Sequence, residues 1–491
     1  MRLSIPLLLA FALTAAATPP PVDPKAIDRL ADDARRAWSV PGLAVVIVRD
    51  GKVVHAAGYG TKRAGKDEPV TADTLFPLAS CTKAFTTAAV AALADDGELN
   101  WDDPVRKHLP TFHLSDPAAD KLVSVRDLFC HRTGIGPHDL LWYRAAWDVD
   151  ETVRRIPLLP LTAPFRGGYQ YSSLPVMAGG KAAANRYGAD WDELVRDKVC
   201  TPLGMTDVAF TSKKAAEFAD RAAGHRLTPA GKVEPMAEYP APEPNPAGSM
   251  FATANGLGRW VRFHLADGRF DGKQVVSAKN LGETRQPHTP IRLDAGVKAQ
   301  NPDTKLMSYA MGWVVYDHRG ELVVAHGGVI DGFRAQVTLL PERNLGFALL
   351  NNLHETKLNL AVGNALIDHL LGLPAKDWTA HYQKVEADEK AAKAAAKKQR
   401  ADERKADVKP THPPEKYAGE YEQRAYGTCT VAVSGGKWEW RYSTFVAPLE
   451  HWQGDTFRVT SGQFEDELIE FDTSGEGVTA VRFRGLEFRR K

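Results

Sequence analysis

The segment Ser80-Cys81-Thr82-Lys83 decides how this sequence of 491 residues is interpreted. It places a hydroxyl and an amine three residues apart, at the start of an apolar run that predicts a helix ending near Gly97. Positions i and i+3 share a helix face, so Lys83 can reach the Ser80 hydroxyl. Ser80 would also lie at the positive end of the helix dipole, which favours negative charge on its oxygen. The layout is typical of acyl transfer by a Ser-Lys pair.

A second copy of the pattern, Ser434-Gly435-Gly436-Lys437, shows that the string alone is not specific. It lies between the strand-like runs Thr428–Val433 and Trp438–Tyr442, and its two glycines predict a hairpin turn. Ser434 is therefore interpreted as a turn residue. Ser80 needs partners elsewhere in the chain before it can be assigned a role.

Composition restricts the class of protein. The chain is 44% hydrophobic and 25% charged with a net charge of +1, which indicates a globular protein of two or three domains and does not support nucleic-acid binding. Residues 1–17, with Arg2, an apolar run and Ala15-Ala16-Ala17, resemble a cleaved secretory signal peptide. We therefore expect export to the periplasm or the extracellular space, with no integral membrane segment after cleavage.

Cysteine and histidine usage predicts neither a disulfide framework nor a metal centre. The four cysteines are scattered and are interpreted as small buried side chains, namely Cys81, Cys130, Cys200 and Cys429. A redox switch at Cys81 is the alternative. No His-Glu-x-x-His string or Cys/His cluster is present in the sequence, so we expect no metal and no cofactor.

The spacing of apolar residues predicts an α/β domain of the layered α+β kind over residues 24–375. A helix over Pro24–Trp38 precedes a hairpin at Asp50-Gly51, and strand patterns return after residue 310. The predicted strands are Leu43–Val48, Lys52–Ala57, Met311–Tyr316, Glu321–Ala325, Phe333–Leu340 and Leu345–Asn351. We expect an antiparallel sheet completed by both ends of the domain, with a helical region inserted between them. Within that region Asn255 is predicted to cap a helix that carries Trp260.

A charged linker over residues 376–411 and a small β domain over residues 412–491 follow. The run Val385–Val408 predicts a solvated helical spacer of about 35 Å at 1.5 Å per residue. Its acids nearly match its bases, which argues against the alternative of a nucleic-acid-binding arm. The alternating Trp438, Trp440 and Tyr442 predict the core of a barrel-like domain, with a ligand-binding face as the alternative.

Two later segments supply partners for Ser80. The first is Tyr169-Gln170-Tyr171-Ser172-Ser173, where a phenol could relay a proton and Ser173 could hydrogen-bond Lys83. The second is His326-Gly327-Gly328, where a histidine at a strand edge precedes glycines that leave room for a substrate backbone. No Gly-x-Ser-x-Gly elbow surrounds Ser80, as a Ser-His-Asp hydrolase of the α/β type would require.

With these motifs in order, residues 25–370 resemble the serine hydrolases of the class C β-lactamase, D,D-peptidase and family VIII esterase type. That family, which shares the penicillin-binding-protein-like fold, has Ser-x-x-Lys, then Tyr-x-Asn, then Lys-Thr-Gly or His-x-Gly. The stretch Val125–Gly134 is similar to its "IRDLLSHTSG" run, and Gly327–Phe333 resembles its "HxGxxxGF" run. The tail from Tyr417-Ala418-Gly419-Glu420-Tyr421 resembles a small β domain of unassigned function that is often appended to these hydrolases.

The resemblance implies a role for each residue. Ser80 would form an ester intermediate, and Lys83 and Tyr171 would share the role of base. The backbone N–H groups of Ser80 and Val329 would form the oxyanion hole, beside Gly328. His326 would orient or protonate groups at the substrate. If it does so, the pH–rate profile should have an acid limb where histidine titrates.

Two departures from the family pattern bear on the substrate. Ser173 stands where the family usually has asparagine, and His326 replaces the lysine of class C β-lactamases. Both weaken the expectation of β-lactam hydrolysis. We therefore expect a serine hydrolase of ester or peptide substrates, and keep a β-lactamase or D,D-carboxypeptidase acting on cell-wall peptides as the alternative. A non-catalytic scaffold of the same fold is the rival from another class, and the sequence does not fix the oligomeric state.

Overall fold

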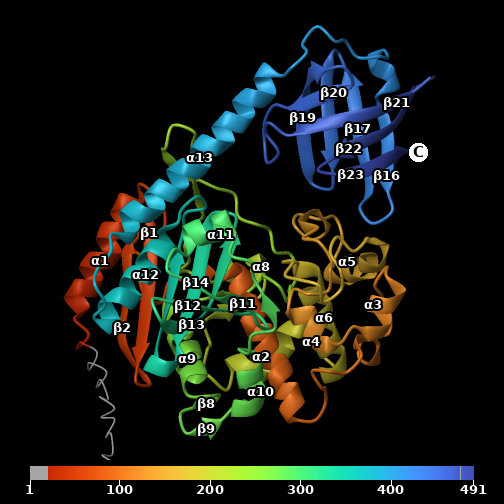
Figure 1. Ribbon diagram of the computed structural model, residues 1–491. Helices are drawn as coiled ribbons and strands as arrows, with labels where there is room; N and C mark the ends of the chain where they lie inside the picture. Colours follow the sequence, from red (N-terminus) through yellow and green to blue (C-terminus); the bar gives the residue numbers. More distant parts are fainter. Residues whose placement is uncertain (1–19, 476) are drawn as a thin grey trace, which may run out of the picture.

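The computed structural model describes residues 20–475 and 477–491, so the predicted signal peptide lies outside the described residues. It shows a large lobe, one long helix and a separate β-barrel (Figure 1). Within the described ranges, the longest apolar helical stretches fall short of what a membrane span requires.

The large lobe is built on one eight-stranded sheet. Its order is β10-β11-β12-β13-β14-β15-β1-β2, and every neighbouring pair is antiparallel. Val45 of β1 pairs with Leu349 of β15, so strands from the two ends of the domain are neighbours in one sheet, as the sequence predicted. The strands are β1 (Gly42–Arg49), β2 (Lys52–Gly60), β10 (Thr289–Pro290), β11 (Met307–Tyr309), β12 (Val314–His318), β13 (Glu321–Ile330), β14 (Phe333–Leu340) and β15 (Leu345–Asn351).

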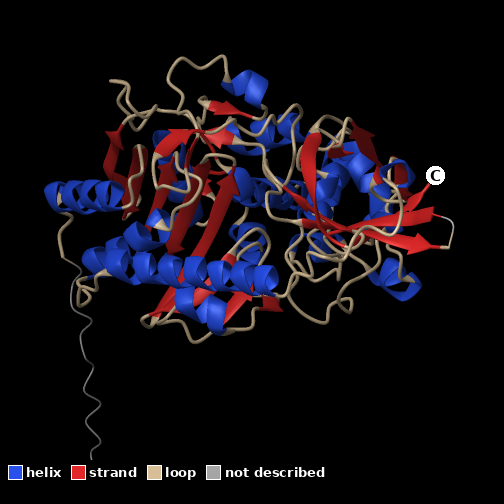
Figure 2. Cartoon of the chain, turned by 90° about the horizontal axis from the view of Figure 1, so that it is seen from above, coloured by secondary structure: helices blue, strands red, loops and turns tan. Residues whose placement is uncertain are grey.

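Helices cover both faces of this sheet (Figures 1 and 2). The alternating side chains of β1 divide between two cores: Val45 packs with α1 and α12, and Val46 packs with α2 and α9. The helices of the lobe are α1 (Pro24–Ala37), α2 (Thr82–Asp95), α3 (Pro117–Leu122), α4 (Val125–Phe129), α5 (Val149–Arg155), α6 (Ser173–Tyr187), α7 (Trp191–Val195), α8 (Ser212–Ala215), α9 (Ala254–Leu265), α10 (Ala278–Glu283), α11 (Ala295–Gln300) and α12 (Leu358–Leu371). Most of the inserted region, α3 to α8, forms a helical part of the large lobe beside the sheet. The prediction of a layered α+β domain with an inserted helical region is therefore confirmed.

Seven shorter strands complete the described part of the lobe. They form one three-stranded sheet and two two-stranded ones. Their bounds are β3 (Phe76–Pro77), β4 (Val208–Ala209), β5 (His225–Leu227), β6 (Val233–Pro235), β7 (Phe251–Ala252), β8 (Arg269–Phe270) and β9 (Lys273–Gln274), with β3, β7 and β4 in one sheet.

Two local predictions were wrong. The strand expected from Met311 begins only at Val314, because Gly312 turns the chain with φ +78°. A Cβ on Gly312 would lie 2.9 Å from the carbonyl carbon of Lys83, so this glycine lets the turn pack against α2. The cap of α9 is Thr253, whose hydroxyl accepts the Gly256 N–H, and Asn255 lies inside the helix.

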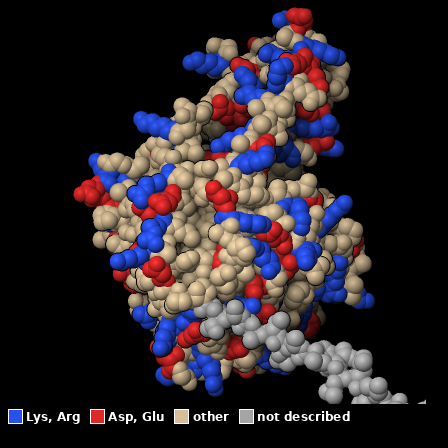
Figure 3. Space-filling model, turned by 60° about the vertical axis from the view of Figure 1, so that its left-hand side comes forward, with Lys and Arg blue, Asp and Glu red and all other residues tan. Residues whose placement is uncertain are grey.

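Helix α13 (Trp378–Asp402) leads from the lobe to the barrel. Its first turns are anchored by the buried Trp378 and Tyr382, and its later residues are exposed. Lys, Glu, Asp and Arg alternate along its sequence, and Figure 3 shows the same mixture of basic and acidic side chains over one face of the molecule. The structure thus has an exposed helix over most of the run in which the sequence predicted a solvated helical spacer.

The C-terminal domain is a closed barrel of eight antiparallel strands, which confirms the barrel-like prediction. Its interior is filled by aromatic side chains, including the fully buried Tyr417, Trp440 and Phe457. Gly435 and Gly436 both have positive φ in the hairpin turn that carries Ser434. The strands are β16 (Gly419–Gln423), β17 (Gly427–Ser434), β18 (Lys437–Tyr442), β19 (Phe445–Gln453), β20 (Thr456–Val459), β21 (Leu468–Ser474), β22 (Gly477–Phe483) and β23 (Leu486–Arg490).

Candidate active site

Ser80 lies in a tight 3₁₀ turn, Ala79–Cys81, that leads directly into α2. Ala79 before it has φ +46°, a backbone conformation that non-glycine residues rarely adopt. The turn keeps Ser80 partly exposed, whereas α2 is buried from Thr82 to Leu93. The Cys81 thiol on the other side donates to the His326 carbonyl at 3.3 Å, which ties the turn to β13.

Lys83 is fully buried and contacts three oxygen atoms. Its Nζ lies 3.0 Å from Ser80 Oγ, 2.8 Å from the Ala247 carbonyl and 3.4 Å from Ser173 Oγ. Burial lowers the pKa of Lys83 to about 7, although the charge of Asp139 acts in the opposite direction. A neutral amine has two N–H groups and one lone pair. These suffice to donate to Ala247 and Ser173 while accepting the Ser80 proton.

Tyr171 approaches Ser80 from the segment before α6. Its phenol donates a hydrogen bond to Ser80 Oγ at 2.9 Å, and burial raises its pKa above the usual value. The His131 ring packs on the Tyr171 ring with centroids 4.2 Å apart, and His131 Nδ1 accepts the Ser172 N–H at 3.2 Å. His131 therefore supports Tyr171 by ring packing and Ser172 by a hydrogen bond.

The strand β13 supplies the opposite wall. It continues through His326-Gly327-Gly328 to Ile330, whereas β12 pairs with it only as far as Ala325. The edge beyond Ala325 is thus left open and lies against the Ser80 turn. At Gly328 a Cβ would lie 2.0 Å from the Leu78 carbonyl oxygen, so only glycine permits this approach. Val329 beside it is 46% exposed, at the mouth of the site.

The His326 ring is held on both of its nitrogens. Nδ1 donates to the Gly327 carbonyl at 2.7 Å, which leaves Nε2 to accept the Tyr309 hydroxyl at 2.9 Å. Burial, reinforced by the charge of Lys83, lowers the pKa of His326 to about 3. The ring is therefore neutral throughout the physiological range, and its titration cannot supply the acid limb expected from the sequence.

The structure joins Tyr171, Ser80, Lys83 and Ser173, in that order, in one chain of hydrogen bonds, with β13 alongside. Sequence reasoning missed the Tyr309 hydroxyl and the Ala247 carbonyl. Neither lies in a motif, and a backbone acceptor has no signature in the sequence. Burial also raises the pKa of Cys81 to about 12, which argues against the redox switch.

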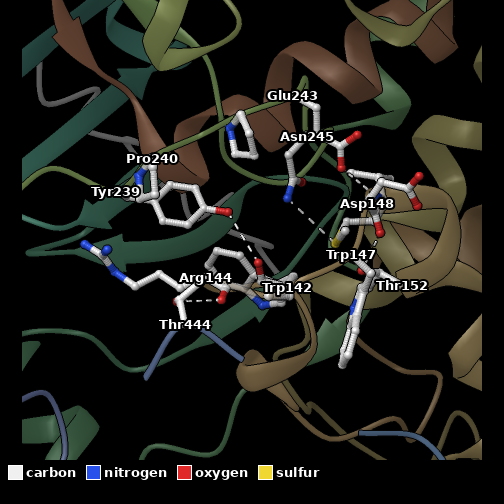
Figure 4. A pocket seen from close by; sticks show the side chains of 14 residues that line it. Trp142, Arg144, Trp147, Asp148, Thr152, Tyr239, Pro240, Glu243, Asn245 and Thr444 are labelled. Atoms are coloured by element: carbon white, nitrogen blue, oxygen red, sulfur yellow. Dashed lines mark hydrogen bonds between the residues drawn. The ribbon is translucent and has the colours of Figure 1, made fainter. Parts of the chain in front are cut away.

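A cavity of about 260 Å³ has Asn245, two residues before Ala247, in its wall (Figure 4). It is connected to Lys83 through one turn of chain: Asn245 Oδ1 accepts the Ala247 N–H at 2.9 Å, and the Ala247 carbonyl accepts from Lys83. Its walls are largely aromatic and apolar, with carboxylates at one end, and include Trp142, Trp147, Met177, Tyr239, Glu243 and Thr444. Over residues 20–475 and 477–491, His, Cys, Asp and Glu side chains form no group of three that could hold a metal ion.

Comparison with known families decides the relationship. The family model described as Beta-lactamase matches residues 27–371, more than half of the chain. The chain belongs to the beta-lactamase family. A second model, described as a domain of unknown function (DUF3471), matches residues 403–491, which contain the barrel.

The individual relatives compared with this chain have low sequence identity to it. The unguisins hydrolase ungD of Aspergillus violaceofuscus is 26% identical over 91% of this chain and 85% of its own length. The octameric penicillin-binding protein homologue of Pyrococcus abyssi superposes with a TM-score of 0.65 at 20% identity, over 95% of this chain and all of that one. The D-amino acid amidase of Ochrobactrum anthropi gives a TM-score of 0.58 at 22% identity, over 71% and 97%. The two structural likenesses establish a shared fold.

Proposed function

We propose that this protein is an exported serine hydrolase that cleaves an ester or peptide bond through an acyl-enzyme on Ser80. The observation that carries the proposal is the position of Ser80 Oγ, 3.0 Å from Lys83 Nζ and 2.9 Å from the Tyr171 hydroxyl. An amine with a pKa of about 7 can accept the serine proton at neutral pH, and a neutral phenol can donate a proton.

In the acylation step Ser80 Oγ attacks the substrate carbonyl carbon while its proton passes to Lys83 Nζ. The backbone N–H groups of Ser80 and Val329 stabilise the oxyanion. The C–O or C–N bond then breaks, and Tyr171 gives its proton to the departing oxygen or nitrogen. The Lys83 ammonium, 5.1 Å from the centre of the Tyr171 ring, stabilises the resulting phenolate.

Deacylation reverses these roles. Water enters where the leaving group was, and the Tyr171 phenolate takes one of its protons as the oxygen attacks the ester carbon. The bond to Ser80 Oγ breaks, and Lys83 returns its proton to the serine oxygen. The acid product leaves with all three groups restored to their starting states.

The remaining site residues act through position. The neutral His326 ring joins β13 to Tyr309 of β11, the Cys81 thiol joins the His326 carbonyl to the Ser80 turn, and Gly328 permits the close approach. Ser173 Oγ, 3.4 Å from Lys83 Nζ, orients the amine. No lysine stands at the His326 position, so a carboxylate-bearing β-lactam would lack a fixed positive charge there. This favours ester and peptide substrates.

Turnover of p-nitrophenyl acetate by the wild type and by Ser80→Ala tests the proposal. We expect Ser80→Ala to lose at least about a thousandfold in kcat, because the nucleophile is removed. Ser434→Ala, which alters the second Ser-x-x-Lys copy in the exposed barrel turn, is the matched control and should retain full activity. Equal rates for wild type and Ser80→Ala would contradict the assignment of Ser80 as the nucleophile.

A further inference from the structure

The barrel contacts the large lobe next to the candidate active site. In the hairpin between β18 and β19, the Ser443 and Thr444 hydroxyls both donate to the Arg144 carbonyl, at 2.7 and 3.0 Å. Thr444 and Arg144 itself also line the cavity that has Asn245 in its wall (Figure 4). One turn of the C-terminal domain is therefore part of the wall of a cavity in the catalytic lobe.

This contact is one of several that fix the barrel in place. The Tyr426 hydroxyl is hydrogen-bonded to His138 Nδ1 at 2.6 Å, and Arg155 donates to the Ala425 carbonyl at 2.8 Å. At its other end the barrel is held by the end of α13, where Lys397 pairs with Asp466 at 2.6 Å. Two separated attachments restrict rotation of the barrel relative to the lobe.

The residues that the barrel holds are connected in turn to the strand β13. The Arg144 side chain contacts Asp331 at 2.6 Å, and the neighbouring Tyr143 hydroxyl donates to both carboxylate oxygens of Asp331, at 2.6 and 2.8 Å. Asp331 is 4% exposed and lies in the turn after β13, two residues beyond Val329. Buried charge pairs of this kind fix geometry, because a displaced partner leaves an unpaired charge.

Aromatic rings also pack between the barrel and the lobe at Tyr143. The Tyr143 ring is stacked with Tyr239 of the lobe, with centroids 5.4 Å apart, and with Phe445 of the barrel at 6.1 Å. Arg144 adopts φ +54°, a conformation that costs energy unless its surroundings hold it. The barrel supplies part of that surrounding through Ser443, Thr444 and Phe445.

The interior of the barrel offers no comparable role. Tyr421, Trp440 and Phe471 fill it together with Tyr417 and Phe457, and their rings pack edge to face or stacked. Side chains packed in this way leave the outer turns as the functional surface.

We propose that the barrel is a positioning element of the active site: through Arg144, Tyr143 and Asp331, its Ser443-Thr444 turn holds the Val329 end of β13 where the oxyanion forms. The proposal gives the C-terminal domain a role in catalysis. Only its predicted effect on kcat rests on the proposed function. Its structural half, that the barrel turn stabilises residues 325–335, stands independently.

The test compares the double variant Ser443→Ala/Thr444→Val with Thr479→Val, in the full-length chain. Thr479→Val removes a hydroxyl-to-carbonyl hydrogen bond on the barrel surface, to Asp472, and is the matched control. With p-nitrophenyl acetate we expect the double variant to lose about fivefold or more in kcat with KM changed less than about twofold, since oxyanion stabilisation is affected rather than binding. Amide hydrogen exchange over residues 325–335 should be faster. Ser443→Ala with Thr444→Ser, which restores one hydroxyl, should recover part of both effects.

A double-mutant cycle with Asp331→Asn tests the route. Because Asp331 is the last link, the double variant should cost little further kcat in the Asp331→Asn background. Kinetics and exchange equal to those of Thr479→Val, or faster exchange with unchanged kcat, would overturn the proposal. If the wild type hydrolyses neither esters nor peptides and forms no adduct on Ser80, the proposed function fails, and the exchange measurement still decides whether the barrel holds β13.

Discussion

Lys83 Nζ lies 3.0 Å from Ser80 Oγ, although the Lys83 side chain is completely shielded from solvent. Burial affects the two candidate bases, Lys83 and Tyr171, in opposite directions. Burial lowers the pKa of Lys83 to about 7 and raises the pKa of Tyr171 above its usual value. The proposed mechanism therefore assigns the amine as the base and the phenol as the acid.

The pH dependence of kcat/KM should report Lys83. Its amine is protonated and inactive below about pH 7, so kcat/KM should fall about tenfold per pH unit on the acid side and reach a plateau above pH 8. His326→Gln should keep this limb at the same pH, because His326 is already neutral. A limb that moved or vanished in His326→Gln would return the titrating role to the histidine.

Replacing Tyr171 by phenylalanine removes the proposed acid and leaves the Ser80–Lys83 pair intact. We expect a loss of about 10²–10⁴-fold in kcat/KM, which reports acylation, for an alkyl ester, and a much smaller loss in kcat/KM for the p-nitrophenyl ester, whose leaving group needs no proton. Tyr169→Phe removes a neighbouring phenol and is the control. Equal losses for both esters would argue against Tyr171 as the acid.

The two glycines after His326 should differ in their tolerance of a methyl group. A Cβ at Gly328 would lie 2.0 Å from the Leu78 carbonyl oxygen, whereas the nearest atom to a Cβ at Gly327 is 3.9 Å away. Gly328→Ala should therefore push β13 away from the Ser80 turn and lower kcat by at least about tenfold. Gly327→Ala should fold and turn over nearly normally. Similar activities for the two variants would show that the close approach is unimportant.

The buried amine should also reduce stability. Between the native pKa of about 7 and the unfolded value of about 10.4, the unfolded wild type binds more protons, so wild-type stability rises with pH there. Lys83→Met has no such group. Its stability relative to the wild type should therefore fall between pH 7 and 9, by up to about 1.4 kcal/mol per pH unit. Urea unfolding at several pH values measures this, and a pH-independent difference would contradict the lowered pKa of Lys83.

Much of this architecture could be predicted from the sequence because it is encoded locally. The hairpin at Asp50-Gly51 and the i, i+3 relation of Ser80 to Lys83 depend on chain geometry within a few residues. The state of His326 could not be predicted, because it depends on burial and on a hydrogen bond from Tyr309, which lies two strands away in the sheet and belongs to no motif. The contact of Ser443 with the Arg144 carbonyl could not be predicted either, because every residue type has a backbone carbonyl.

The covalent intermediate on Ser80 is the centre of this account, and intact-mass spectrometry of the protein tests it most directly. Acid quenching during turnover of a p-nitrophenyl ester, or treatment with a fluorophosphonate, should add one acyl or phosphonyl group to the wild type and to Ser434→Ala. Peptide mapping should place that group on Ser80, and Ser80→Ala should gain no mass. Hydrolysis that persists in Ser80→Ala, or an adduct at another residue, would contradict the account.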